Sequence, residues 1–183
     1  RTTTYWCGAI YYNGGQSVLH SVCGNDCCSN THGLFARIQV YNEVMSKNYV
    51  NYSSIARSVS EISNSQQILY LNYGKICCPS ANISQIKCHY YSGINCNPFN
   101  DSSSVTCSFS YSTFSDNIAI LYNCIGLWTT GANYEIKSCN ILRNSQVSSS
   151  EGTINTYGNL MIEDSCILEN NATCIFYASS YKI

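Results

Sequence analysis

Cysteine is the side chain with the greatest capacity for chemistry in this chain, which has 13 cysteines among 183 residues. Cysteines form disulfides in oxidising compartments, and they bind zinc where pairs recur at Cys-x-x-Cys spacing. Two groups are close in sequence: Cys23, Cys27 and Cys28, and Cys77, Cys78 and Cys88 with His89. Neither group has the paired spacing of a tetrahedral zinc site, so we predict disulfides rather than metal ligation.

The adjacent pairs Cys27-Cys28 and Cys77-Cys78 cannot bridge within themselves. Their Cα atoms are ~3.8 Å apart across a trans peptide, below the ~4.4 Å minimum of ordinary disulfides. Each member is therefore expected to bond elsewhere. Because 13 is an odd number, at least one thiol stays free or finds its partner outside this chain segment. Sequence alone leaves the connectivity open.

Histidine gives little support for nucleophilic catalysis. His20, His32 and His89 are far apart in the sequence, and none recurs beside a serine or cysteine together with an acid. A triad needs all three groups in mutual contact, and no spacing here indicates one. We therefore predict no catalytic, cofactor-binding or metal-binding residue and no cofactor.

Three similar segments in the second half of the chain indicate which elements position these side chains. Residues 104–117, 133–144 and 159–170 each close on an asparagine, namely Asn117, Asn144 or Asn170. The steps between these asparagines are 144 − 117 = 27 and 170 − 144 = 26 residues. A nearly fixed period indicates a chain that stacks one unit repeatedly, so a long surface is its default product.

Apolar and polar residues alternate inside the repeated unit. Phe109, Ile136 and Ile162 align in one column, and the residues beside them are mostly polar, which is typical of a half-buried strand. The next apolar column consists of Phe114, Ile141 and Ile167. It lies five residues further on, an odd spacing that one face of a strand cannot accommodate. The chain must therefore bend between two strands.

Asparagine and glycine mark two predicted corners. Asn117, Asn144 and Asn170 suit a corner because asparagine tolerates left-handed backbone and can stack its amides into ladders. Gly14, Gly131 and Gly158 each follow an apolar residue by four positions, and glycine adopts positive φ without strain. The unit therefore runs strand, asparagine corner, strand, glycine corner, as a coil of parallel strands.

The motifs in these units resemble the alternating GGAI and FxxN motifs of polymorphic-outer-membrane-protein repeats. The GGAI-like segments are Cys-Gly-Ala-Ile at 7–10 and Gly-Thr-Ile at 152–154. The FxxN-like segments are Phe-Ser-Asp-Asn at 114–117, Ile-Leu-Arg-Asn at 141–144 and Ile-Leu-Glu-Asn at 167–170. Such repeats occur in large surface proteins of bacteria and parasitic protozoa. The resemblance covers roughly residues 5–15 and 105–178, and it implies a right-handed parallel β-helix.

Charged residues recur in two columns, one with Asp116, Arg143 and Glu169 and the other with Lys137 and Glu163. Parallel β-helices include polysaccharide lyases and hydrolases, which use clustered carboxylates for calcium or for acid/base work. Stacked coils would hold these residues about 4.8 Å apart. Because opposite signs alternate and neutralise one another, we predict a surface charge ladder rather than a catalytic site.

The composition favours a single all-β domain spanning residues 1–183. Charged residues are only 10% while tyrosine numbers 16, a mixture suited to strands. A repeat of about 26 residues predicts a solenoid of about seven coils. The stretch 39–72 fits this pattern worst, and we predict strands with a less regular inserted segment there. The net charge of −1 offers no basic field for nucleic acid, and no apolar run is long enough to insert in a membrane.

Four sequons, together with the cysteine count, predict passage through the secretory pathway. They start at Asn51, Asn82, Asn100 and Asn171, which are therefore candidates for N-glycosylation. The tyrosines and the two tryptophans, Trp6 and Trp128, are expected to fill the core and surface rather than to form a sugar-binding platform.

Three classes of function fit this sequence. The first is a non-catalytic extracellular surface or structural β-helix, adhesin-like or coat-forming, with other protein chains or cell-surface glycans as partners. The second is a subunit of an extracellular filament, because apolar residues near both ends suggest a piece of a longer β-helix or a protomer that stacks head to tail. The third is a carbohydrate-active enzyme.

Overall fold

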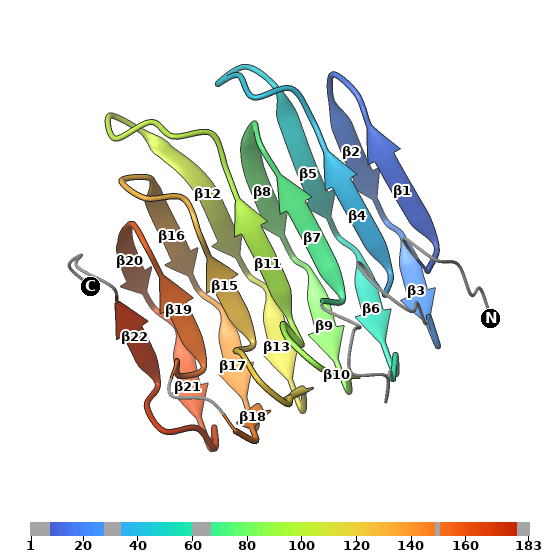
Figure 1. Ribbon diagram of the computed structural model, residues 1–183, viewed down its shortest axis with the longest axis vertical. Coiled ribbons are helices and arrows are strands. Elements are labelled where there is room, and N and C mark those ends of the chain that lie inside the picture. Colours follow the sequence, from blue (N-terminus) through green and yellow to red (C-terminus); the bar gives the residue numbers. More distant parts are fainter. Residues whose placement is uncertain (1–7, 28–33, 60–66, 149–150, 179–183) are drawn as a thin grey trace.

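The protein is an all-β solenoid in a computed structural model that describes residues 8–27, 34–59, 67–148 and 151–178. All strand pairings are parallel, and the chain winds as a right-handed coil with the N-terminal and C-terminal coils at opposite ends (Figure 1). The predicted fold class is therefore confirmed. Cys7, Trp6 and His32 lie outside the described residues, as does Cys28.

Three long sheets, named A, B and C, run along the solenoid. Sheet A contains β1 (Ile10–Asn13), β4 (Ala36–Gln39), β7 (Leu69–Asn72), β11 (Ile94–Asn97), β15 (Ile125–Leu127), β19 (Ile154–Thr156) and β22 (Phe176–Ala178). Sheet B contains β2 (Ser17–His20), β5 (Lys47–Asn51), β8 (Lys75–Pro79), β12 (Val105–Ser110), β16 (Asn133–Lys137) and β20 (Asn159–Glu163). Sheet C contains β3 (Cys23–Asn25), β6 (Ser54–Ala56), β9 (Asn82–Ser84), β13 (Thr113–Ser115), β17 (Asn140–Leu142) and β21 (Cys166–Leu168).

A short fourth sheet, sheet D, consists of β10 (Lys87–Cys88), β14 (Ile118–Ala119) and β18 (Ser145–Gln146). Six strands in sheet B correspond to 6 − 1 = 5 turns between its first and last strands, slightly fewer coils than the seven predicted. The reason is that coil length varies. Coil length can be measured as the number of residues between paired positions on neighbouring strands of sheet A. From the first pair of strands to the last it is 26 (residue 10 to 36), 33 (36 to 69), 25 (70 to 95), 31 (94 to 125), 29 (125 to 154) and 22 (154 to 176) residues.

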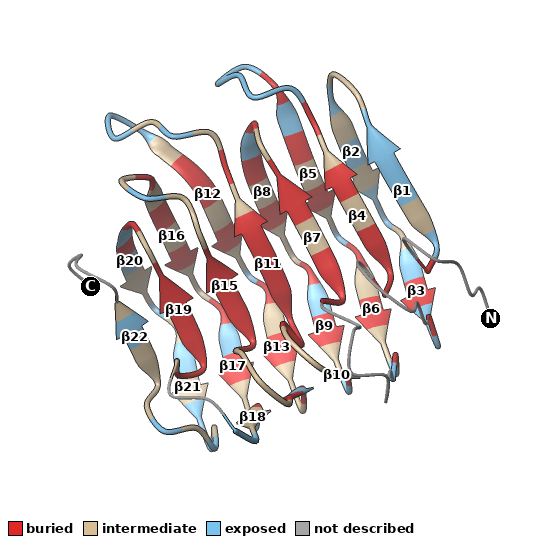
Figure 2. Cartoon of the chain, viewed as in Figure 1, coloured by how far each residue is buried: buried red, intermediate tan, exposed pale blue. Residues whose placement is uncertain are grey.

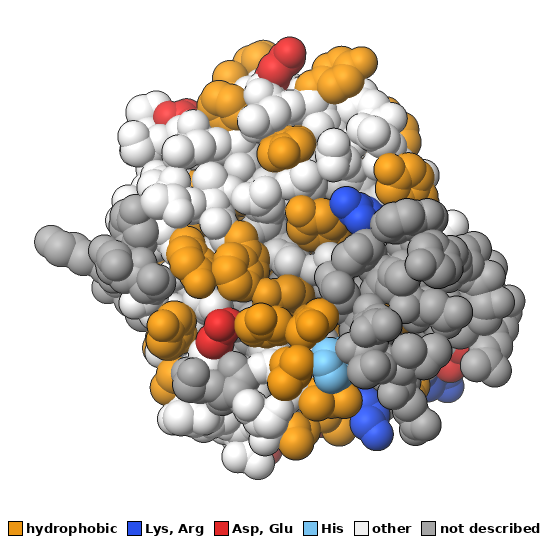
Figure 3. All heavy atoms as spheres, in the orientation of Figure 1, with side chains coloured by type: hydrophobic (Ala, Val, Ile, Leu, Met, Phe, Trp, Pro, Cys, Tyr) orange, Lys and Arg blue, Asp and Glu red, His pale blue; other side chains and the backbone are white. Residues whose placement is uncertain are grey.

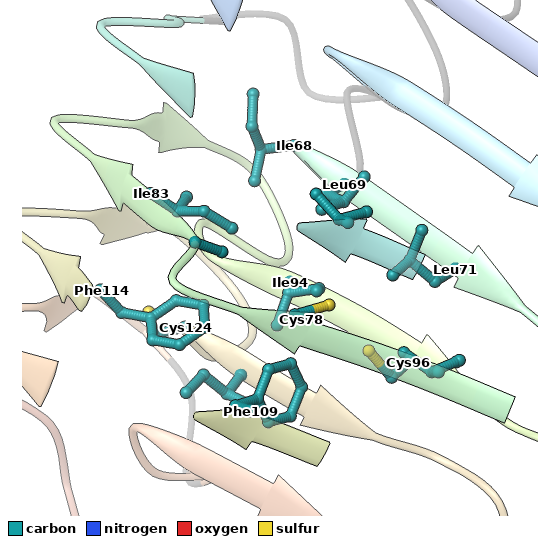
Figure 4. Close-up of a cluster of buried hydrophobic side chains, with 14 of the residues drawn as sticks. Ile68, Leu69, Leu71, Cys78, Ile83, Ile94, Cys96, Phe109, Phe114 and Cys124 are labelled. Atoms are coloured by element: carbon teal, nitrogen blue, oxygen red, sulfur yellow. The ribbon is translucent and has the colours of Figure 1, made fainter. Parts of the chain in front are cut away.

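The predicted apolar columns form the core. Phe109, Ile136 and Ile162 are register neighbours in sheet B, and the first two are fully buried. The second column is also in register, along sheet C: Phe114, Ile141 and Ile167. Buried residues recur along the strands of the solenoid (Figure 2), and Figure 4 shows a cluster of their side chains, including Phe109 and Phe114, between the strands.

The bend predicted between these columns is a corner of constant length. Two residues separate sheet B from sheet C in every coil: 21–22, 52–53, 80–81, 111–112, 138–139 and 164–165. The first residue of each pair has positive φ. The second often carries a hydroxyl that serves the neighbouring coil, as when the Ser112 Oγ accepts a hydrogen bond from the backbone N–H of Ala81 at 3.0 Å.

The three predicted corner asparagines lie two residues after the ends of β13, β17 and β21. The Asn117 Oδ1 accepts from the N–H of Ile86, the Asn144 Oδ1 from that of Asn117, and the Asn170 Oδ1 from that of Asn144. Each side-chain amide also donates to a sheet C carbonyl of the preceding coil. The asparagines thus connect successive coils.

The left-handed backbone lies one residue earlier than expected, at Asp116, Arg143 and Glu169, whose φ angles are 57°, 52° and 56°. Asparagine is therefore used here for its side-chain amide rather than for its backbone tolerance. The predicted glycine corners need a similar correction. Gly14, Gly131 and Gly158 all lie between sheets A and B, but of these only Gly131 has positive φ.

The stretch 39–72 joins the same stack. It contains β5 and β6, and it ends on β7. Residues 40–46 form a loop between β4 and β5, and residues 60–66 are outside the described residues. Coil length is greatest here, at 33 residues, which explains why the repeat is hard to recognise in this segment.

The cysteines differ most from expectation. Nine of the described cysteines carry unpaired thiols: Cys23, Cys77, Cys78, Cys88, Cys96, Cys107, Cys124, Cys139 and Cys166. The prediction that Cys77 and Cys78 each form a disulfide is therefore wrong. Cys78, Cys96 and Cys107 are completely buried among apolar side chains, where cysteine packs as a small hydrophobic residue.

Candidate functional site

The charged columns form ion pairs between coils, as predicted. Arg143 Nε donates to Asp116 Oδ1 at 2.7 Å and Lys137 Nζ to Glu163 Oε2 at 2.9 Å. The hydrogen bonds from Arg143 hold the pKa of Asp116 below its usual value. All four side chains are substantially exposed, so solvent screening makes each pair a weak contributor to stability.

The sequence analysis found no spacing that indicates a metal site or a catalytic triad. Within the described ranges, no cluster of three or more histidine, cysteine or acidic side chains could hold a metal ion. His20 packs edge-on against Tyr52, while His89 packs edge-on against Tyr90. These two histidines therefore have aromatic neighbours.

The four sequon asparagines are spread along the solenoid. Asn82, Asn100 and Asn171 are exposed. Asn51 is half-buried, and its Oδ1 is buried without a hydrogen-bond partner. Three of the four candidates therefore present their side chains to solvent as glycosylation requires.

The outward face of sheet A carries most of the chemistry that the sequence analysis did not assemble. One outward column runs through Tyr11, Arg37, Tyr70, Asn95, Gly126, Asn155 and Tyr177. A second contains Gln39, Asn72 and Asn97. Figure 3 shows this face, with hydrophobic side chains gathered over its middle.

Five aromatic rings form a continuous cluster over this face. Tyr91 stacks on Tyr122 with ring centroids 5.4 Å apart, and it meets Trp128 edge-on at 5.9 Å. Trp128 in turn stacks on Tyr157 at 4.6 Å. The fifth ring, Tyr90, lies 4.9 Å from Tyr122. The cluster therefore follows the solenoid axis across several coils.

Gly126 is the residue that lets these rings lie close to the sheet. A Cβ atom at this position would come within 2.7 Å of Trp128 Nε1 and 3.0 Å of the Tyr91 ring. Any side chain here would therefore push both rings away. The glycine is in the outward column of β15, so its effect is local to the aromatic cluster.

A cleft of about 520 Å³ opens beside the cluster. Its lining combines one cation, three aromatic rings and three amides: Arg37, Tyr70, Tyr91, Trp128, Gln67, Asn95 and Asn97. None of these described lining residues is acidic. We call this the sheet A cleft.

Hydrogen bonds order the amides around the cleft. Asn95 Nδ2 donates to Gln67 Oε1 at 2.6 Å, and Asn97 Nδ2 donates to Asn72 Oδ1 at 2.8 Å. Thr129 Oγ1 donates to Asn97 Oδ1 at 2.7 Å. The Asn95 Oδ1 and the Trp128 Nε1 are buried without hydrogen-bond partners. The cleft wall therefore has one acceptor and one donor whose hydrogen bonds are not satisfied.

Arg37 is held by a ring rather than by a carboxylate. Its guanidinium carbon lies 5.4 Å from the centroid of the Tyr70 ring, within the range of a cation–π interaction. Burial raises the pKa of the Tyr70 hydroxyl, although the Arg37 charge opposes that shift. Tyr70 therefore remains a neutral stacking surface beneath the cation.

Glu151 is the acidic group nearest to the aromatic cluster among the described residues. Its Oε2 accepts a hydrogen bond from Asn155 Nδ2 at 2.9 Å. Desolvation raises its pKa above the usual value, and the hydrogen bond partly opposes this. Burial is the main cause of the raised pKa of Tyr91 and Tyr157, and the Glu151 charge adds to it, which places Glu151 beside those rings.

The arrangement combines flat aromatic surfaces with ordered amides and one cation. Protein sites use rings to stack against flat apolar faces and a few placed polar groups to fix orientation. The sequence analysis did not bring these aromatic residues together. The relevant signal in the sequence was the group Tyr90, Tyr91, Tyr122 and Trp128, whose members lie outside the repeated columns.

No protein-family model, curated protein or solved structure matches this chain. Among the described residues, no helix has both the length and the apolar character needed to cross a membrane.

Proposed function

We propose that this protein is a non-catalytic extracellular surface protein whose solenoid presents a glycan-binding face. The observation that carries the proposal is the sheet A cleft, in which Tyr70, Tyr91 and Trp128 accompany three amide side chains and one arginine. A sugar ring has both an apolar face and a rim of hydroxyls. The first suits stacking on aromatic rings, and the second suits hydrogen bonding to amides.

The rest of the fold supports this proposal by making the site rigid. Arg37, Tyr70, Asn95 and Asn97 lie on strands whose register is fixed on both sides by parallel partners, so these four side chains require little ordering on binding. The exposed sequon asparagines favour a secreted product. A stack of coils also suits an adhesin-like rod or a surface coat.

A glycan array with the purified protein tests the proposal. We expect binding to a defined set of glycans, and we expect Trp128→Ala to weaken it by about tenfold or more, because ring stacking is worth ~1–3 kcal/mol per ring by comparison with other flat ligands. Tyr41→Ala is the matched control, since Tyr41 is exposed and does not line the cleft. Absence of glycan binding, or equal binding by both variants, would contradict the proposal.

One observation favours a carbohydrate-active enzyme as a second candidate. Glu151 lies beside Tyr91 and Tyr157 with a raised pKa, as a general acid requires. Glycosidases ordinarily use two carboxylates, and Glu151 is the single acid found near the rings among the described residues. Incubation of bound glycans with the protein distinguishes the two functions. New reducing ends that disappear in Glu151→Gln would establish the enzyme.

A further inference from the structure

We propose that the ligand of the sheet A cleft is an acidic glycan, with a sugar carboxylate bound by Arg37. This inference rests on the proposed glycan-binding function and adds the chemical class of the ligand. It follows from three features of the cleft: an arginine without an acidic partner, the separation of charges along the solenoid, and the length of the lined surface.

The N–H donors of the Arg37 guanidinium are not engaged by an acidic side chain among the described residues. Both ion pairs within the described residues involve other cations, and the described contact of the Arg37 guanidinium is with the Tyr70 ring. This cation–π contact engages the charge of the guanidinium and provides no carboxylate for its N–H donors. A planar fork of N–H donors matches a carboxylate, which it can bind through two parallel hydrogen bonds.

The charges on this face are separated along the axis. Arg37 belongs to β4, whereas Glu151 precedes β19, four strands further along sheet A. Strands about 4.8 Å apart place these residues roughly 19 Å from each other along the solenoid. The described residues that line the cleft include a cation and no acid, so their field favours an anion at the Arg37 end.

The lined surface is longer than one sugar ring. Arg37, Tyr70, Asn95 and Trp128 come from four successive coils, on β4, β7 and β11 and immediately after β15. Three strand spacings amount to about 14 Å. The occupant is therefore a chain of several sugar units lying along the axis, with a carboxylate over Arg37 and a ring stacked near Trp128.

Isothermal titration calorimetry with two matched probes tests this inference. One probe is a tetramer of galacturonic acid, and the other is the same tetramer with its carboxyl groups methyl-esterified. We expect the acidic probe to bind more tightly, and we expect Arg37→Gln to weaken its binding by about tenfold or more while leaving the ester unchanged. Arg37→Lys should recover only part of the affinity, because it restores the charge without the fork.

Lys75→Gln is the matched control, because Lys75 is an exposed cation at the start of β8 in sheet B. The Lys75→Gln variant should bind both probes with the same affinity as the unmodified protein. Equal binding of both probes, unaffected by Arg37→Gln, would overturn the acidic ligand while leaving the proposed glycan-binding function intact. Binding of neither probe, together with a silent glycan array, would overturn both.

Discussion

At the scale of single residues, the corner asparagines act as connectors between coils. Asn144 shows this most fully. Its Oδ1 accepts from the N–H of Asn117 at 3.1 Å, and its Nδ2 donates to the Phe114 carbonyl at 2.9 Å and to Asn170 Oδ1 at 3.0 Å. Only 2% of the Asn144 surface is exposed, so water cannot replace these hydrogen bonds if the side chain is removed.

Asn144→Val should therefore destabilise the protein by about 2–4 kcal/mol, since it leaves a buried N–H and a buried carbonyl without partners. Ser145→Val is the control, because Ser145 is the next residue and is only half-buried. Urea denaturation monitored by circular dichroism gives both free energies of unfolding. Equal midpoints for the two variants would show that the asparagine side chain does not connect the coils.

The thiols provide a second test at this scale. Cys23 and Cys166 are exposed, whereas Cys78, Cys96 and Cys107 are fully buried. Burial also raises the thiol pKa in the core, to about 12 for Cys124, so little reactive thiolate is present at neutral pH.

We expect iodoacetamide to modify Cys23 and Cys166 in the native protein and the buried cysteines only after unfolding. Peptide mass spectrometry before and after addition of guanidinium measures this difference. Rapid native labelling of Cys107 would show that sheet B faces the other way. Failure of Cys23 to react even after unfolding would show that it is not a thiol.

At the scale of elements, each strand is fixed by the neighbour above and below it. Ile136 on β16 lies in register between Phe109 on β12 and Ile162 on β20. The adjacent residue, Glu135, points away from the core and is half-buried. Burial therefore alternates along the strand, and a substitution at one position has a very different cost from one at the next.

Ile136→Asp should prevent folding, because an unpaired buried charge costs several kcal/mol against a total stability of ~5–15 kcal/mol. Glu135→Gln, the matched control, should fold normally. Limited proteolysis of the soluble fraction distinguishes them. A protease-resistant Ile136→Asp variant would refute the register of sheet B.

The strand columns could be predicted because alternation and the five-residue step are local properties of the sequence. The left-handed positions could not, because the residues that occupy them, such as Arg143 and Glu169, are not types that favour this conformation. The nature of the Asn corner, with a side chain that reaches the neighbouring coil, only becomes apparent in three dimensions. A similar limit applies to the cysteines, whose spacing does not distinguish a core thiol from a bridged one.

The sheet A cleft could not be predicted for a related reason. Tyr91, Tyr122 and Glu151 come from the segments that precede strands of sheet A, and these segments differ in length from coil to coil. Each lies three residues before the first residue of a sheet A strand, but the spacings, 122 − 91 = 31 and 151 − 122 = 29 residues, differ from the period of 26 to 27 found in the sequence.

At the scale of the whole molecule, variation in coil length is confined to particular places. The corner between sheets B and C always has two residues, whereas the segment between sheets A and B ranges from two residues at 73–74 to seven at 98–104. The stacking of coils therefore requires a corner of constant length between sheets B and C. It tolerates loops of different length between sheets A and B.

Insertions should reveal this asymmetry. Four glycine and serine residues placed between Ser102 and Ser103, both exposed, should cost under about 1 kcal/mol, because loop closure depends weakly on length. One glycine placed between Tyr111 and Ser112 should cost several times more, since it displaces the Ser112 hydroxyl from Ala81. Thermal unfolding measures both, and similar losses would contradict a fixed corner.

The corners between sheets B and C constrain the sequence, because their length must stay constant for the coils to stack. The loops beside sheet A are free to change in length and sequence. Loops of unequal length border sheet A on both sides, and sheet A is also the sheet that carries the cleft. Substitutions in these loops can therefore accumulate without affecting the hydrogen bonds that join one coil to the next. Under the proposed glycan-binding function, related chains would be able to differ in their clefts while sharing one backbone.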